Sequence, residues 1–157
     1  MAEKHMVLLF VAAAVLAGQA DGADICEKAE YMSLCRSSVK GATEPAAGLQ
    51  AAIEHLILET KHAKESSMKL GAMKCLDVCK QNYDDAVTDL QKSVQYLTKN
   101  DKPSLKISLS AALTDYVTCD DAVMESGNSK KVGDLMSVDV VLRHMAANCL
   151  HLASLLK

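Results

Sequence analysis

The sequence predicts an all-α fold, an up-down-up-down four-helix bundle preceded by a short helical hairpin that a disulfide staples. Three observations lead to this prediction. Apolar residues recur at helical spacing in four long stretches, whereas no stretch shows the alternation of a strand. The connections between these stretches are short, so neighbouring helices should run antiparallel. Cys26 and Cys35, with eight residues between them, precede the first long stretch and suit a local bridge.

The N-terminal residues predict export. A polar start that carries Lys4 leads into the apolar run Met6–Ala17, and small residues follow. This order is typical of a secretory signal peptide, and the run falls short of the about 20 residues that a membrane span needs. A buried N-terminal helix is the alternative interpretation. The expected division is a signal peptide over 1–22 with cleavage near 20–23, and one secreted domain over 24–157 with the hairpin at 24–41 and the bundle at 44–157.

Each long stretch carries one apolar stripe, which buries that face of the helix against its neighbours. The four stretches are Ala46–Ser67, Gly71–Leu97, Ser104–Glu125 and Asp134–Leu156. In the second stretch the stripe begins at Ala72, and its steps of 4, 3, 4, 3, 4, 4 and 3 residues approach a heptad seam. In the last stretch the stripe is Leu135, Val138, Leu142, Met145, Cys149, Leu152 and Leu156. We therefore expect the stripe residues in the core.

Residues that start and stop helices separate these stretches. Thr43 is expected to cap the first long helix, with Pro45 in its first turn, and Asp101 is expected to cap the third. Gly71 marks the break before the second helix, and Gly127 ends the third.

The geometry of the bundle ranks the pairings of the other four cysteines. The second and third helices are antiparallel, and Cys79 lies on the shared seam near the height of Cys119. Cys75 and Cys149 lie on helices of the same direction and should differ in height by roughly 20–30 Å, whereas a disulfide needs Cα atoms within about 7 Å. We expect a Cys79–Cys119 bond and free thiols at Cys75 and Cys149. The even number of cysteines favours a third bond, but this argument is weaker than the geometry.

Composition and spacing exclude several functions. The net charge of −3 offers no basic field for nucleic acid, and aromatic residues at 3% offer few rings for stacking. Metal-ligand spacing is absent, so neither a metal nor a cofactor is expected, and no later apolar run reaches the length of a membrane span. The pairs Asp84–Asp85 and Asp120–Asp121 point about 100° apart on a helix, so we interpret them as solvated faces or partner contacts rather than catalytic dyads. The chain is therefore not expected to be an enzyme.

Four segments carry motifs of a known family. They are Cys26-(eight residues)-Cys35, the run from Cys79 to Val87 with Leu90, the run from Leu109 to Thr114, and Thr118-Cys119-Asp120-Asp121-Ala122. Together they resemble the plant invertase and pectin methylesterase inhibitor family, and the resemblance extends from Ile25 to the C-terminus. It implies a four-helix bundle with an N-terminal helical hairpin, one disulfide in the hairpin and one between the second and third bundle helices. This is the pairing that geometry predicts.

One motif separates the two activities of that family. Invertase inhibitors resemble one another in a Pro-Lys-Phe motif between the second and third bundle helices, where this sequence has Lys102-Pro103-Ser104-Leu105. The Ser-Ala-Ala-Leu-Thr segment at 110–114 is more similar to the esterase-directed branch. The resemblance therefore implies a secreted inhibitor of plant pectin methylesterase in the apoplast or cell wall. Cell-wall or vacuolar acid invertase is the alternative target.

The expected mechanism is occlusion of the enzyme's pectin-binding cleft in a 1:1 complex. We expect a monomer, with a covalent dimer through Cys75 or Cys149 as the alternative. The candidate contact residues are polar, lie off the apolar stripes and are expected to be exposed: Asp77, Gln81, Asp84, Asp85, Thr114, Asp115, Thr118 and Asp121. Solvated surface is the competing interpretation of each. A secreted carrier of lipids or other hydrophobic ligands is a different class, which predicts a cavity inside the bundle and which a tight seam disfavours.

Overall fold

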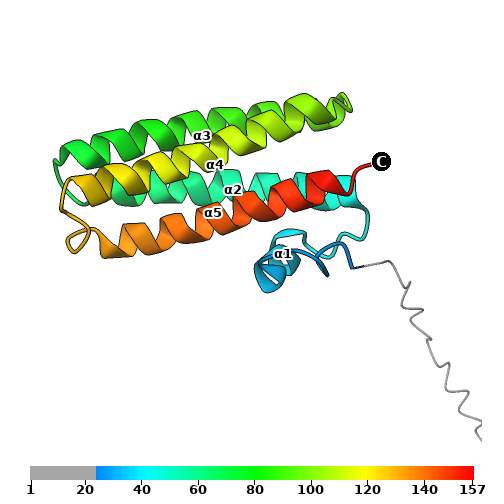
Figure 1. Cartoon of the computed structure of the whole chain (residues 1–157), viewed down its shortest axis with the longest axis horizontal. Helices are drawn as coiled ribbons and strands as arrows, with labels where there is room; N and C mark the ends of the chain where they lie inside the picture. The colour runs from blue at the N-terminus through cyan, green and yellow to red at the C-terminus, as the bar shows by residue number, and fades with distance from the viewer. Residues whose placement is uncertain (1–23) are drawn as a thin grey trace, which may run out of the picture.

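Five α-helices make up the part of the protein that the computed structural model describes, residues 24–157 (Figure 1). The predicted signal peptide lies outside the described residues. The helices are α1 (Met32–Ser38), α2 (Pro45–Met68), α3 (Lys74–Thr98), α4 (Lys102–Glu125) and α5 (Gly133–Ser154). The four long helices run alternately in opposite directions, and no strand occurs within residues 24–157.

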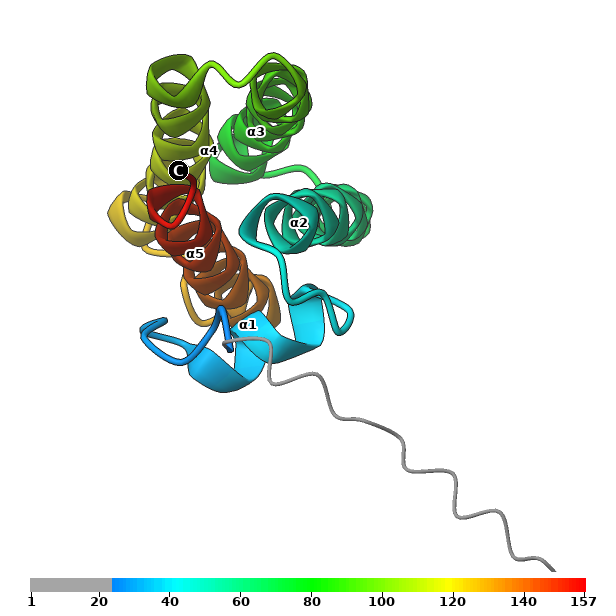
Figure 2. The same cartoon turned by 90° about the vertical axis from the view of Figure 1, so that its right-hand side faces the viewer.

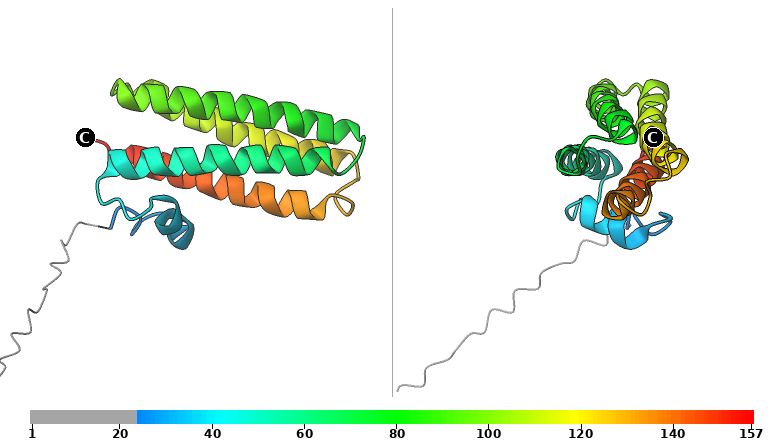
Figure 3. Two further views of the ribbon diagram at one scale, coloured as in Figure 1. Left: turned by 180° about the vertical axis from the view of Figure 1, so that it is seen from behind. Right: turned by 90° about the vertical axis from the view of Figure 1, so that its left-hand side faces the viewer.

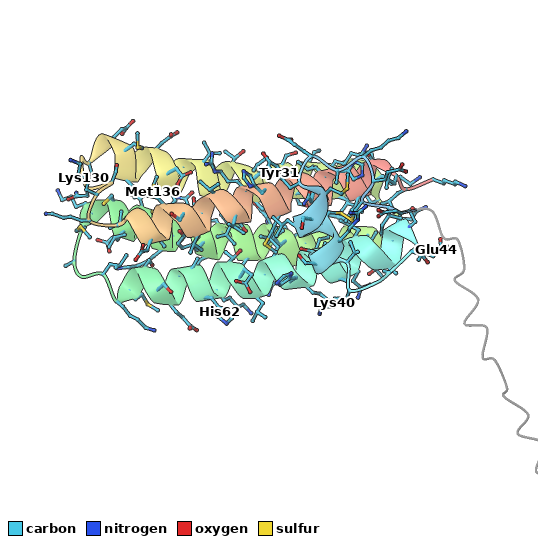
Figure 4. The ribbon with its side chains drawn as sticks, turned by 90° about the horizontal axis from the view of Figure 1, so that it is seen from below. Tyr31, Lys40, Glu44, His62, Lys130 and Met136 are labelled. Carbon is cyan, nitrogen blue, oxygen red and sulfur yellow. A yellow bond between two sulfur atoms is a disulfide. The ribbon has the colours of Figure 1, made fainter. Side chains whose placement is uncertain are left out.

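The long helices close into a ring in the order α2, α3, α4 and α5, with α5 packed against α2 (Figures 2 and 3). The most extensive of the helix contacts joins α3 and α4. Helix α1 packs against α2 and α5, on the side of the bundle opposite α3 and α4 (Figures 2 and 4). The predicted all-α, up-down-up-down architecture is therefore confirmed.

A single core contains most of the predicted stripe residues, and hydroxyl groups pair with one another across it. Tyr83 and Tyr116 are fully buried, with ring centroids 6.5 Å apart. The Tyr116 hydroxyl shares a 2.6 Å hydrogen bond with the Thr60 hydroxyl, which joins α4 to α2 across the core. The hydroxyls of Ser93 and Ser108 share a 2.7 Å bond between α3 and α4. Paired polar groups of this kind carry little desolvation cost and restrict how the helices pack.

Two stripe predictions are wrong. Ala72 is exposed and precedes α3, which begins at Lys74. Val138 is 39% exposed, and the neighbouring Asp139 occupies the inward position of α5 instead. The inward row of α5 follows the steps of 4, 3 and 4 residues that join Leu135, Asp139, Leu142 and Ala146. Helical geometry rather than side-chain polarity selects this row.

The helix ends agree with the sequence at every predicted position except Thr43. Pro45 is the first residue of α2, and Gly71 lies in the break between α2 and α3. Asp101 caps α4, because its carboxylate accepts a 3.2 Å hydrogen bond from the Ser104 backbone N–H. Gly127 has a φ of +69° just beyond the end of α4, a conformation that suits glycine. The prediction for Thr43 is wrong, because Glu44 is the N-cap residue of α2 and makes no side-chain cap bond. Glu44 is extended, as a residue before proline prefers to be.

The N-terminal hairpin is anchored on α2 and α5. Its first arm is a series of turns rather than a helix, so α1 is its one helix. The Asn148 side chain of α5 donates a 3.0 Å hydrogen bond to the Tyr31 carbonyl. The Ile25 side chain approaches α2 so closely at Gly48 that a Cβ there would overlap it. A glycine at this position therefore permits the hairpin to dock.

Both predicted disulfides are present. The Cα atoms are 5.7 Å apart in Cys26–Cys35 and 4.4 Å apart in Cys79–Cys119. Cys75 and Cys149 are free and buried. Burial raises the pKa of the Cys149 thiol to about 12, so this group stays protonated and unreactive.

We predict that the double variant C79A/C119A loses about 4 kcal/mol of unfolding free energy. The bond closes 40 residues of chain, and constraining the unfolded chain stabilises the fold by about this amount in the chain-entropy account. The variant C26A/C35A is the matched control, with an expected loss of about 2.5 kcal/mol because its loop is 9 residues. Urea unfolding followed by circular dichroism measures both values. A smaller loss for C79A/C119A than for the control would contradict the prediction.

Candidate functional site

Helices α3 and α4 position all of the predicted contact residues. The Cys79–Cys119 bond joins the two helices and sets the height at which each residue of α3 lies beside α4. The pair lies opposite α1, so the hairpin leaves its outer surface uncovered (Figures 1 and 2). We call the solvent-facing side of α3 and α4 the candidate face.

The contact residues predicted on α4 are exposed with one exception. Thr114, Thr118 and Asp121 are exposed. The expectation is wrong for Asp115, which is half-buried, and whose Oδ2 atom is buried without a hydrogen-bond partner among the described residues. The neighbouring helix α3 covers Asp115 on one side. The sequence stripe of α4 did not reveal this, because coverage depends on how α3 lies.

The contact residues predicted on α3 are exposed but point in different directions. Asp84 forms a 2.6 Å ion pair with Lys64 of α2, so it lies on the α2 side of α3. Asp77 pairs with Lys80 on its own helix at 3.0 Å. The negative charge of Asp85 contributes, after burial and the charge of Asp89, to raising the pKa of Asp115 on α4. Gln81 is exposed. The structure therefore brings Asp85 and Asp115 together and turns Asp84 away from them.

Two carboxyl groups of α3, those of Asp85 and Asp89, lie near enough to Asp115 of α4 to influence its ionisation. Burial, followed by the charges of Asp89 and then Asp85, raises the pKa of Asp115 to about 6. Lys92 lies 2.8 Å from Asp89 and offsets part of this negative charge. The charge of the candidate face therefore changes near pH 6.

The outward surface of α4 differs from that of α3 in having few charges. Ile107 is 71% exposed, Val117 36% and Met124 63%, and Thr114 and Thr118 lie in the same segment. These three exposed apolar residues were not predicted from the sequence. They could have been recognised there, because their helical positions are out of phase with the inward stripe of α4. Exposed apolar and hydroxyl groups without charges suit a contact that excludes water.

A buried polar cluster lies behind the candidate face, between α4 and α5. Asp120 is 8% exposed, so the prediction of a solvated Asp120–Asp121 face is wrong for Asp120. Its Oδ2 atom lies 3.1 Å from Nε of Arg143 on α5. Asp139 of α5 is completely buried and was missed. The sequence could have indicated this, because Asp139 lies four residues after Leu135 and three before Leu142, in the inward row of α5.

An open cleft with a volume of about 700 Å³ lies at one end of the bundle. Its apolar lining includes Ile25, Pro45, Leu97, Leu155 and Leu156. It lies between the hairpin and the ends of the helices rather than inside the bundle. This cleft is therefore not the interior cavity that a hydrophobe carrier predicts.

Two structural features are absent from residues 24–157. No group of three or more metal-ligand side chains gathers in this range. None of its helices combines the length and apolar character that crossing a membrane requires.

Comparison with known proteins places the chain among inhibitors. The sequence profile of the family described as plant invertase/pectin methylesterase inhibitor matches residues 22–152. Pectinesterase 3 of Phaseolus vulgaris is 28% identical in an alignment 138 residues long, which covers 76% of this chain and 24% of that protein. The chain thus spans about a quarter of the length of this curated relative.

Two solved structures share the fold. Mutant form A of a pectin methylesterase inhibitor from Arabidopsis superposes with a TM-score of 0.72 at 16% identity, over 87% of this chain and 97% of that one. A pectin methylesterase inhibitor from Arabidopsis thaliana superposes with a TM-score of 0.65 at 16% identity, over 89% and 98% of the two chains. At this level of identity, the likeness establishes the five-helix fold.

We predict that the Asp115 carboxyl titrates with a midpoint of about pH 6. Because its folded-state pKa is raised, Asp115 favours the fold below its ordinary pKa of 3.8, and this contribution is lost as the pH rises to about 6. Carbon-13 NMR of the carboxyl groups measures the midpoint. D89N should lower it by removing the larger neighbouring charge, whereas D134N on exposed α5 surface should leave it unchanged. A midpoint near 4 in the wild type would contradict the prediction.

Proposed function

The chain belongs to the plant invertase/pectin methylesterase inhibitor family, and from this premise we propose that it occludes the pectin-binding cleft of a plant pectin methylesterase in a 1:1 complex. Members of this family inhibit enzymes, so the chain is an inhibitor and not itself an enzyme. The target, the stoichiometry and the contact residues are the proposed elements.

Two features favour the esterase over acid invertase as the target. The sequence between α3 and α4 is Lys102-Pro103-Ser104-Leu105 and lacks the Pro-Lys-Phe motif that the resemblance associates with invertase inhibitors. A segment similar to this chain also forms part of a protein named pectinesterase 3. The invertase remains the alternative outcome of the experiment below.

The outward surface of α4, where exposed apolar and hydroxyl side chains outnumber charged ones, is the observation that carries the proposal. Cores of protein interfaces are depleted in charged residues, whereas their rims are polar. Thr114, Val117 and Thr118 fit the core of such a contact, and Asp85, Gln81 and Asp121 fit its rim. Pectin carries carboxylates, so a cleft that binds it should attract an acidic rim on the inhibitor.

We also propose the cell wall or apoplast as the site of action. Members of the family are extracellular, and the N-terminal pattern over residues 1–22 has the order of a removable signal peptide. Residues 24–157 then form the working inhibitor, which we propose acts as a monomer. The buried positions of Cys75 and Cys149 support this, because neither thiol is presented to a second copy.

We predict that T114R weakens inhibition of a pectin methylesterase by about 10–100-fold, because a bulky cation at the centre of the contact is left desolvated and unpaired. S137R is the matched control. Thr114 and Ser137 are both exposed helical residues whose hydroxyls donate 3.0 Å bonds to the carbonyl one turn earlier, but Ser137 lies on α5.

The measurement is titration of each protein against pectin methylesterase and acid invertase, with circular dichroism to verify that helicity is intact. The proposal expects S137R to match the wild type. Equal inhibition by the wild type, T114R and a second variant, D121K, would remove the candidate face from consideration. Inhibition of the invertase alone would replace the proposed target.

A further inference from the structure

The buried carboxyl groups of Asp120 and Asp139 form an acidic pair with no role in the proposed contact. Asp139 has no exposed surface, and Asp120 is 8% exposed. Asp120 lies on α4 and Asp139 on α5, so the pair spans the seam between these helices. Their side chains face one another closely enough for each to alter the pKa of the other.

The pair lacks donors for its oxygen atoms. Neither Oδ1 nor Oδ2 of Asp139, nor Oδ1 of Asp120, has a hydrogen-bond partner of ordinary geometry among the described residues. An ionised carboxylate only accepts hydrogen bonds. Two ionised carboxylates that face each other in the core therefore provide acceptors but no donor to bond them. A single proton on one of them supplies the missing donor. It also removes one of the two buried negative charges.

The charged and titratable groups around Asp139 come from several helices. Helix α3 contributes Tyr83, whose hydroxyl lowers the pKa of Asp139 and so acts against the larger effects of burial and of Asp120. Helix α4 contributes Tyr116 as well as Asp120. Helix α5 itself contributes Arg143, whose Nε is 3.1 Å from Asp120 Oδ2. From α2, Thr60 bonds the Tyr116 hydroxyl and does not ionise.

These neighbours supply one cation for two carboxyl groups. Burial, followed by the charge of Asp120, raises the pKa of Asp139 to about 8, and burial also raises the pKa of Asp120. Both shifts favour retention of a proton by the pair.

We propose that Asp120 and Asp139 share one proton that holds α4 against α5, and that the loss of this proton as the medium turns alkaline weakens the seam. The proton bridges the two carboxyl groups, and Arg143 balances the remaining negative charge on Asp120. When the proton leaves, two negative charges face one cation in the core. This shared proton acts on the fold, and its effect does not depend on which enzyme the chain inhibits.

The direction of the pH dependence follows from linkage. In the unfolded chain Asp139 has an ordinary pKa of 3.8, and in the fold its pKa is about 8. Between these values the folded protein holds a proton that the unfolded chain does not, so stability falls as the pH rises. The contribution is complete below about pH 4 and lost above about pH 8.

The test compares thermal unfolding of the wild type with D139N, whose amide has the shape of the carboxyl group without its ionisation. Between about pH 6 and about pH 8 the remaining titration of Asp115 is common to both proteins, so it cancels in the comparison. The wild-type melting temperature should fall by roughly 10 °C more than that of D139N across it. D134N is the control, because Asp134 is an exposed acid on the same helix, and it should keep the wild-type slope.

Carbon-13 NMR of the carboxyl groups adds a readout that does not require D139N to fold. The Asp120–Asp139 pair should retain one proton above pH 6, and D120N should lower the midpoint of Asp139 by removing its negative neighbour. An Asp139 midpoint near 4 in the wild type would overturn the proposal. A D139N variant that keeps the full wild-type slope would also overturn it.

Discussion

The contact between α3 and α4 is the constraint on which the rest of the structure depends. A nearly heptad seam packs the two helices, and the Cys79–Cys119 bond fixes their relative height with Cα atoms 4.4 Å apart. This register places Asp115 beside Asp85 and Asp89. It also leaves the outer surface of α4 free of other elements (Figure 1). A slide of one turn, about 5.4 Å, would separate these groups.

Helices α3 and α4 expose different kinds of side chain. Helix α3 exposes carboxylates and lysines, several of which pair on the surface as Asp77 does with Lys80. Such pairs contribute little to stability but keep the surface solvated. Helix α4 instead exposes Ile107, Val117 and Met124. The two helices together offer a surface with few charges beside a more highly charged one. Protein interfaces combine a core depleted in charges with a polar rim in the same way.

The fold was predictable from the sequence to a large extent, whereas the candidate site was predictable only in part. Helical periodicity located the long helices, and rise per residue ranked the cysteine pairs, because both depend on the geometry of single helices. Thr43 failed as a cap because Pro45 forces the residue before it into an extended conformation. Val138 failed as a core residue because hydrophobicity alone could not decide between adjacent positions of α5.

The sequence by itself determined the all-α class, the order of the helices and both disulfides, since these follow from spacing along the chain. Only the tertiary structure decided the surroundings of Asp115, Asp120 and Asp139. Each of these residues belongs to a helix whose own pattern does not reveal what a neighbouring helix covers. Burial, and with it the protonation of a carboxyl group, depends on atoms contributed by other helices. For that reason the acidic groups became distinguishable only once α3, α4 and α5 were packed together.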